Sequence, residues 1–182
     1  MTYNLTCSMH DTFAAFSGTG MRMANQFFPA QCGLAAADVK PMLQICGSTD
    51  FACSANDQNA WLSSYAESLS CRGNPTTTQV TATTSCRKYS RCGPGQDEPL
   101  EGCMITGLGH CWSGNNCCDS QCANQNPANL DSSAYLLNWF NSVPARAADK
   151  AKAPLADRLR AQLAHTTFSF TVAPQSNATQ TN

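Results

Sequence analysis

The sequence has little charge and no excess of positive charge. Only 13% of its 182 residues are charged, whereas roughly 25% is usual, and 11 basic side chains stand against 12 acidic ones. Binding to nucleic acid or to anionic lipids depends on clustered lysine and arginine, which this composition does not supply. The chain also lacks an apolar run of about 18 residues, the length that indicates a membrane-spanning helix. We therefore expect neither nucleic acid nor a membrane as a partner.

Cysteine, in contrast, is abundant. Twelve cysteines in 182 residues are many for a protein of a reducing compartment, and an even number fits either a disulfide framework or a metal site. A secreted disulfide protein should begin with a signal peptide. Residues 1–11 read MTYNLTCSMHD, with neither a basic stretch nor an apolar core. The simplest explanation of this conflict is that the natural chain starts further upstream.

Short apolar segments predict the strands. Buried strands are expected at residues 13–17, 39–46 and 103–106, because each is a brief apolar run that ends near glycine. The β-branched run at residues 77–84 predicts an edge strand. Residues 86–100 are rich in cysteine, glycine and proline and are interpreted as a connection without regular structure.

Amphipathic segments predict helices between these strands. Residues 57–69 have Asp57 as a candidate N-cap, and their apolar side chains lie on one helical face. A second helix is expected to begin after Asp131 and to stop before Pro144. The alternation of buried strands with helices predicts an α/β sheet in a single domain.

Two side chains suited to acid–base chemistry follow predicted strands. Asp50 comes after the strand that ends at Cys46, and His110 comes after the strand that ends near Thr106. In open α/β sheets, functional groups gather beyond the carboxyl ends of the strands. α/β-Hydrolases use a serine, an acid and a histidine in that chain order, and Asp50 and His110 fit the last two places. The alternative is a turn aspartate and a loop histidine that share no role.

Three segments then resemble one known family. Residues 105–114, ITGLGHCWSG, are similar to the family segment G-G-G-H-x-W-P-G. Residues 40–50, KPMLQICGSTD, are similar to P-V-L-x-I-H-G-x-x-D, and residues 130–140, LDSSAYLLNWF, to a closing D-A-S helix. These motifs, in this order, resemble extracellular esterases of the polyhydroxybutyrate depolymerase and feruloyl esterase type, with related acetylxylan esterases. Ser113 replaces the proline of the first segment and Cys46 the histidine of the second.

The resemblance covers roughly residues 1–144 and implies a fold and a site. The expected fold is the disulfide-rich C-terminal part of an α/β-hydrolase sheet, and residues 145–182 are expected to form an extension, helical and then disordered. The resemblance assigns Asp50 as the triad acid and His110 as the catalytic base. It also suggests that Trp112 lines the substrate pocket, although plain core packing explains this tryptophan equally well.

The nucleophile of the family is not found. No G-x-S-x-G motif occurs in the sequence, and Ser17, in the nearest imitation, is better interpreted as the end of a strand. Residues 1–7 resemble the helix that follows the family's serine. The chain is therefore expected to begin just after the nucleophile elbow, without the N-terminal strands of the sheet, and to be inactive alone. The strands at 13–17 and 39–46 would then have unpaired edges.

The cysteines near His110 leave two interpretations open. Cys111, Cys117, Cys118 and Cys122 could hold zinc, but their spacing does not repeat a C-x-x-C pair. Disulfides that hold the loop of His110 are favoured, and no metal or other cofactor is expected. The resemblance further suggests that one disulfide joins Cys71 to Cys92.

The expected function is that of a secreted carboxylic ester hydrolase. The family resemblance suggests feruloyl or acetyl esters of plant cell-wall polysaccharide, or a polyhydroxyalkanoate, and the sequence does not choose among these substrates. One alternative is a catalytically inactive, cysteine-rich extracellular protein that is derived from an esterase and serves binding or structure. Another is a metal-binding module built on residues 110–122.

Overall fold

The computed structural model describes residues 2–20, 32–95, 97–114 and 130–144. The predicted extension at 145–182 lies outside these residues. The helices are α1 (Thr2–Ser8), α2 (Ala55–Ser68) and α3 (Ser132–Ser142), and the strands are β1 (Phe16–Thr19), β2 (Met42–Gly47), β3 (Thr76–Gln79), β4 (Thr84–Cys92) and β5 (Glu98–Ile105).

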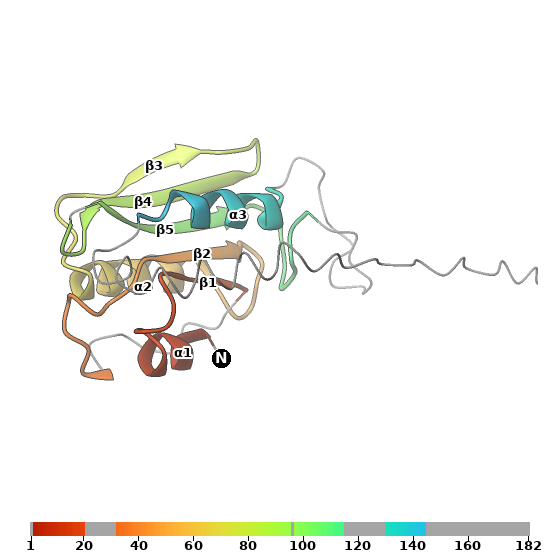
Figure 1. The fold of residues 1–182 in the computed structure, drawn as a ribbon. Coiled ribbons are helices and arrows are strands. Elements are labelled where there is room, and N and C mark those ends of the chain that lie inside the picture. The colour runs from red at the N-terminus through yellow and green to blue at the C-terminus, as the bar shows by residue number, and fades with distance from the viewer. Residues whose placement is uncertain (1, 21–31, 96, 115–129, 145–182) are drawn as a thin grey trace, which may run out of the picture. The chain divides into compact units, whose positions relative to one another are not determined.

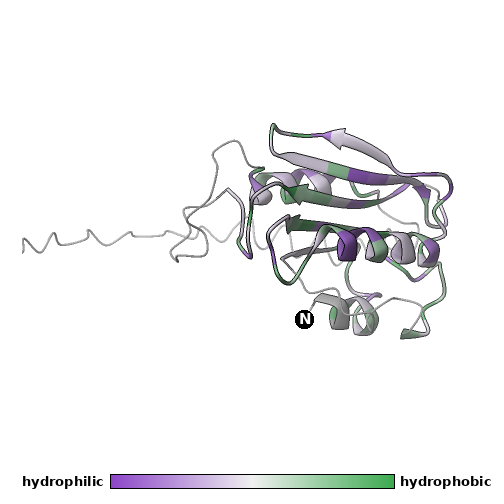
Figure 2. Ribbon diagram, turned by 180° about the vertical axis from the view of Figure 1, so that it is seen from behind, coloured by the Kyte–Doolittle hydropathy of each residue, from purple (hydrophilic) through white to green (hydrophobic). Residues whose placement is uncertain are grey.

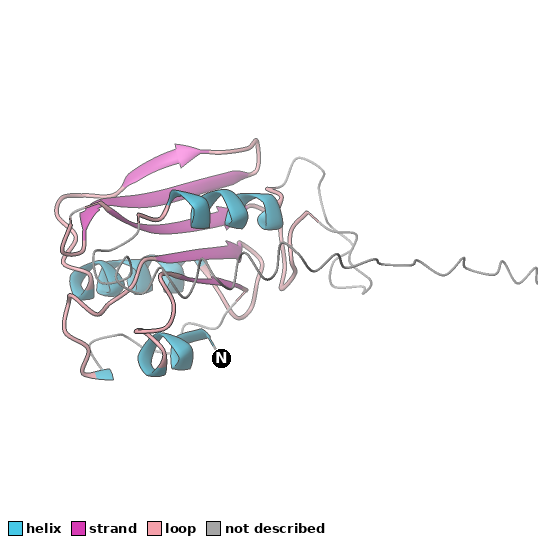
Figure 3. Cartoon of the chain, in the orientation of Figure 1, coloured by secondary structure: helices cyan, strands magenta, loops and turns pink. Residues whose placement is uncertain are grey.

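The strands form one mixed sheet in the order β1-β2-β5-β4-β3 (Figure 1). β1, β2 and β5 run parallel, whereas β5, β4 and β3 pair antiparallel. The sheet therefore has a parallel half and an antiparallel ribbon, which share β5. Figure 3 shows this sheet together with the helices of the chain. The architecture is α/β, as the alternation of segments predicted.

Helices cover the two faces of the sheet. Because successive side chains of a strand point to opposite faces, β2 and β5 contribute to two separate cores. On one face Met42 and Leu100 pack with Trp61, Leu62 and Tyr65 of α2. On the other face Leu43, Ile45, Cys103 and Ile105 pack with Leu136 and Trp139 of α3. Gly102 in β5 permits the close approach of α2, because a Cβ there would lie 2.4 Å from Leu62 Cδ1.

The predicted helices are confirmed with one correction. Trp61, Leu62, Tyr65 and Leu69 are buried, as the apolar face predicted. The N-cap of α2 is Ser54 rather than Asp57, and the Ser54 hydroxyl accepts a hydrogen bond from the Asp57 backbone N–H. Asp57 instead lies in the first turn, where a negative charge favours the helix dipole. Asp131 does cap α3, through a hydrogen bond from Ala134 N.

The strand predictions located β1, β2, β3 and the end of β5, but they missed β4 and the first part of β5. β1 lies a few residues beyond the predicted 13–17, whereas β2 and the end of β5 match their apolar runs. β3 is the expected edge strand, but it is shorter than predicted. The interpretation of residues 86–100 as a connection was wrong, because β4 and the first part of β5 lie there. Figure 2 shows green, hydrophobic segments on β2 and β5 and paler colours on β3.

The edges of the parallel half differ from the expectation. β2 was expected to have an unpaired edge, but it is paired on both sides, by β1 and by β5. Between β2 and β5 the chain forms α2, β3 and β4. It then returns to pair with β2 through β5. Within the described residues, β1 pairs with β2 alone and forms the end of the sheet.

Disulfides connect the elements of the fold. The structure contains the pairs Cys7–Cys32, Cys46–Cys53, Cys71–Cys92 and Cys86–Cys103. The pairing of Cys71 with Cys92, suggested by the resemblance, is confirmed. Several disulfides in one chain are typical of an oxidising compartment. No helix in the described residues is long and apolar enough to cross a membrane.

Candidate acid–base site

Two loops at one edge of the sheet carry the candidate catalytic residues. The parallel strands β2 and β5 end in register, with Gly47 beside Ile105. Ser48 N donates a hydrogen bond to Ile105 O at 2.9 Å, and Thr49 N donates one to Leu108 O at 3.0 Å. These hydrogen bonds tie the loop after β2 to the loop after β5. The two segments that the sequence singled out therefore meet at one place.

Asp50 and His110 form a direct pair at this place. His110 Nδ1 lies 3.1 Å from both carboxylate oxygens of Asp50. The Asp50 side chain is fully buried, whereas that of His110 is 42% exposed. Because a carboxylate only accepts hydrogen bonds, Nδ1 carries the hydrogen in the neutral ring and Nε2 keeps its lone pair. The arrangement leaves Nε2 as the nitrogen that can accept a proton.

Contacts within its own loop fix the orientation of the Asp50 carboxylate. Asp50 Oδ1 accepts a hydrogen bond from Ala52 N at 2.7 Å, and Asp50 N donates one to Gly47 O at 3.1 Å. The disulfide Cys46–Cys53 closes the segment that contains Asp50. These contacts orient the carboxylate and, through it, the His110 ring, and a fixed orientation is what a general base needs to reach the proton that it removes.

Glycines allow the close approach of backbone to this pair. A Cβ at Gly47 would lie 2.0 Å from Leu108 O, so any side chain there would separate the two loops. Gly20, which follows β1, has a φ of +57°. A Cβ at Gly20 would lie 3.2 Å from Asp50 Oδ2 and 3.3 Å from His110 Nδ1. The end of β1 therefore forms a third side of the site.

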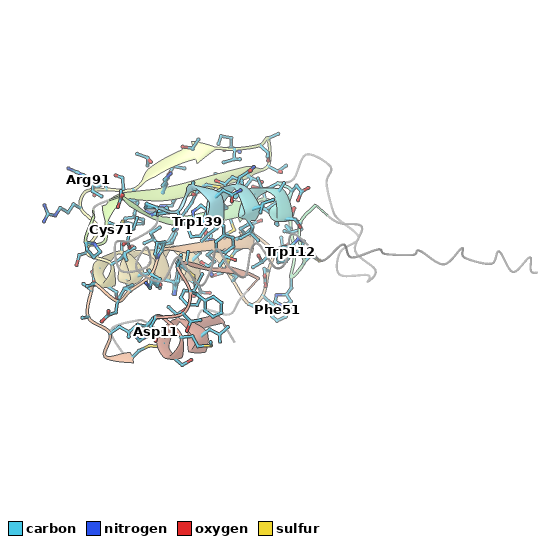
Figure 4. The ribbon with its side chains drawn as sticks, viewed as in Figure 1. Asp11, Phe51, Cys71, Arg91, Trp112 and Trp139 are labelled. Atoms are coloured by element: carbon cyan, nitrogen blue, oxygen red, sulfur yellow. A yellow bond between two sulfur atoms is a disulfide. The ribbon has the colours of Figure 1, made fainter. Side chains whose placement is uncertain are left out.

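Two exposed aromatic side chains lie on the loops that carry Asp50 and His110. The centroid of the Phe51 ring lies 5.0 Å from that of His110, and the Phe51 side chain is 83% exposed. Trp112 is 41% exposed, and its Nε1 donates a hydrogen bond to Ser133 Oγ at 3.0 Å. Trp112 is therefore not a core residue, which removes the plainer explanation of this tryptophan. Figure 4 shows Phe51 and Trp112 at the end of the sheet where β2 and β5 terminate.

The described residues offer little to a metal ion. Cys86, Glu101 and Cys103 lie close enough to share one metal ion, but the two cysteines are joined in a disulfide and cannot act as thiolate ligands. Cys111, beside His110, is also disulfide-bonded. Cys117, Cys118 and Cys122 of the suggested cluster lie outside the described residues.

Sequence reasoning missed two residues of this site. Gly20 belongs to the glycine-containing turn that was interpreted only as the end of the strand at 13–17, although its place after a buried strand fits a position that needs a positive φ. Phe51 was not predicted as a site residue, although it follows Asp50 directly. Ser17 lies within β1, paired with Leu43, and thus not on a nucleophile elbow. In the described part of the chain, the His110 side chain hydrogen-bonds to Asp50 alone.

The chain matches no model of a protein family, and it matches no curated protein.

Proposed function

We propose that Asp50 and His110 are the acid and the base of a secreted serine esterase of the α/β-hydrolase type. One observation carries the proposal: His110 Nδ1 lies 3.1 Å from both oxygens of a buried carboxylate, while the ring itself is exposed beyond the ends of parallel strands. The order of Asp50 and His110 in the chain is that of α/β-hydrolases. The several disulfides support secretion.

In the proposed reaction, His110 acts first as a general base and then as a general acid. Nε2 takes the proton of a serine hydroxyl while the serine oxygen attacks the ester carbonyl, and the imidazolium is stabilised by Asp50. The alcohol then leaves with the proton from Nε2, and an acyl-enzyme remains. Water attacks this acyl-enzyme by the same route, which releases the acid and restores the serine. The proposal places the serine in polypeptide outside these 182 residues, since they contain no G-x-S-x-G motif.

The nucleophile can be sought directly in the native protein. An antibody raised against the 182-residue chain would capture the protein from its natural source. The captured protein is then treated with a fluorophosphonate probe, and the labelled peptide is mapped by mass spectrometry. We expect the label on a serine within G-x-S-x-G, in the same polypeptide as His110. Heat-denatured protein serves as the control and should not react.

The role of Asp50 can be tested separately, in the polypeptide that carries both the reactive serine and His110. Asp50→Asn should lower kcat by about 10⁴-fold, because the asparagine no longer holds the tautomer with a free Nε2.

Captured protein that takes up no fluorophosphonate label when folded would contradict the esterase proposal. That result would favour the alternative of a binding or structural protein with the same fold.

A further inference from the structure

We propose that Phe51 is the wall of a binding site for a planar, apolar group of the ester, placed against the face of His110. The inference rests on the proposed function, because it takes His110 as the base. It adds a residue that neither the motifs nor the resemblance assigned. It also favours substrates with an aromatic group over simple acetyl esters.

The exposure of Phe51 sets it apart from the other apolar side chains. At 83%, it is the most exposed large apolar residue of the described chain, and Leu137 follows at 63%. Single exposed apolar residues on a surface are ordinary and need no explanation. Phe51, however, lies beside the one exposed ring that can accept a proton at this edge of the sheet.

The turn that carries Phe51 is held on both sides. The carboxylate of Asp50, the preceding residue, accepts a hydrogen bond from the N–H of Ala52, the following residue. The disulfide Cys46–Cys53 closes the same segment. A ring on a fixed turn loses little conformational freedom when a ligand covers it, so its binding energy is not spent on ordering the loop.

The contact between Phe51 and His110 determines where a bound group would lie. The Phe51 and His110 rings are tilted by 39° at a centroid distance of 5.0 Å, which leaves most of the Phe51 ring free. A flat group that covers the free part of Phe51 would lie next to the imidazole. The ester bond attached to such a group would then be near Nε2, where the proposed chemistry takes place.

The chemistry of Phe51 and Trp112 selects the ligand. Phe51 has no polar side-chain atom, and the indole N–H of Trp112 is already donated to Ser133 Oγ. Neither ring has a hydrogen bond to offer a polar or charged ligand. Flat aromatic faces pack favourably against another aromatic ring, in offset or edge-to-face contact. We therefore expect a planar aromatic group rather than a sugar hydroxyl or a carboxylate.

Ligand titrations of the 182-residue chain test this inference without any turnover. The chain, labelled with ¹⁵N and ¹³C, is titrated with methyl cinnamate and with methyl acetate, and the His110 ring resonances are followed by NMR. We expect methyl cinnamate to shift the His110 resonances and to bind more tightly than methyl acetate. Phe51→Ala should weaken binding of methyl cinnamate about two- to tenfold and leave methyl acetate unaffected. Phe140→Ala removes an exposed phenylalanine of α3 and should change neither affinity.

The outcomes separate this inference from the proposed function. Equal binding of the two esters, or methyl cinnamate binding that Phe51→Ala does not weaken, would overturn the Phe51 site, whatever the fluorophosphonate result. Tight, Phe51-dependent binding in a protein that shows no reactive serine would keep the aromatic site and reject the esterase. A Phe51→Ala spectrum that retains the dispersion of the parent spectrum shows that the variant is folded.

Discussion

The two halves of the sheet differ in what surrounds their strands. In the parallel half, β2 is buried at every position and β5 at all but one. In the antiparallel ribbon, β4 mixes buried with exposed positions and β3 is exposed throughout. All of the candidate chemistry lies on the loops that follow parallel strands. A buried parallel core fixes the directions in which its loops leave, whereas an exposed ribbon does not require such precision.

The largest difference between the halves is expected in stability. Leu43→Ala removes a fully buried side chain of β2 and should cost about 2–5 kcal/mol in the free energy of unfolding. Thr77→Ala changes an exposed side chain of β3 and should stay within about 0.5 kcal/mol. Urea denaturation of both variants measures the contrast. Equal losses would show that the ribbon is as integral to the core as the parallel half.

The disulfides offer a second comparison. Cys86–Cys103 joins β4 to β5 across 17 residues of sequence, and in the chain-entropy model its removal costs about 3 kcal/mol. Cys46–Cys53 spans only 7 residues and should contribute less to global stability. Since Cys46–Cys53 closes the turn of Asp50, its loss should nevertheless disturb the site.

Replacing each pair by alanine separates stability from site geometry. We expect Cys86→Ala/Cys103→Ala to lower the urea midpoint more, while the His110 resonances remain in place. Cys46→Ala/Cys53→Ala should shift the His110 resonances with a smaller loss of stability. The comparison fails if the ribbon disulfide, and not the one near Asp50, controls the His110 spectrum.

The same difference explains which strands the sequence revealed. β2 and the end of β5 are apolar runs, because both of their faces are buried, and such runs are visible without any partner. β4 contains Arg87, Lys88 and Arg91, since much of it faces solvent, and its cysteines suggested a loop. Its strand character depends on pairing with β5 and β3, which is tertiary information that the local composition does not contain.

For the candidate site, the sequence located the pair but not its surroundings. Asp50 and His110 could be found because each follows a buried strand, and parallel strands bring their loops to one edge. Gly20 and Phe51 could not, since their roles depend on distances between β1 and two other loops. The resemblance pointed to Trp112, but its exposure and its hydrogen bond to Ser133 required the structure.

The third prediction concerns β5, the strand that both halves share. Glu101 pairs with Leu43 on one side and Lys88 on the other, and its buried carboxylate accepts a hydrogen bond from the Tyr135 hydroxyl of α3. Tyr135→Phe leaves this carboxylate without that donor and should cost about 1–2 kcal/mol at neutral pH. Chemical denaturation at pH 7 measures the loss.

The pH dependence of this contact has a definite sign. Burial, and then the hydrogen bond and charge of Glu101, raise the pKa of Tyr135 well above its usual range. In the unfolded chain the phenol ionises near pH 10, while in the folded chain it stays protonated. The unfolded state therefore binds fewer protons above about pH 10, and the parent protein loses stability there. The advantage of the parent over Tyr135→Phe should shrink as the pH rises from 9 to about 11. A constant advantage across this range would contradict the raised pKa.

The smallest expected change in stability tests the site most closely. Gly20 and Gly33 both have positive φ, at +57° and +69°, so alanine should cost each position about 1 kcal/mol in backbone strain. Only at Gly20 would the new methyl group meet Asp50 and His110, whereas a Cβ at Gly33 has nothing within 4 Å. Gly20→Ala should therefore move the His110 Nδ1 proton resonance, and Gly33→Ala should leave it unchanged at a similar loss of stability. If both variants leave that resonance in place, the end of β1 does not take part in holding the pair. The acid–base geometry would then belong to β2 and β5 alone, and the parallel half would supply two sides of the site instead of three.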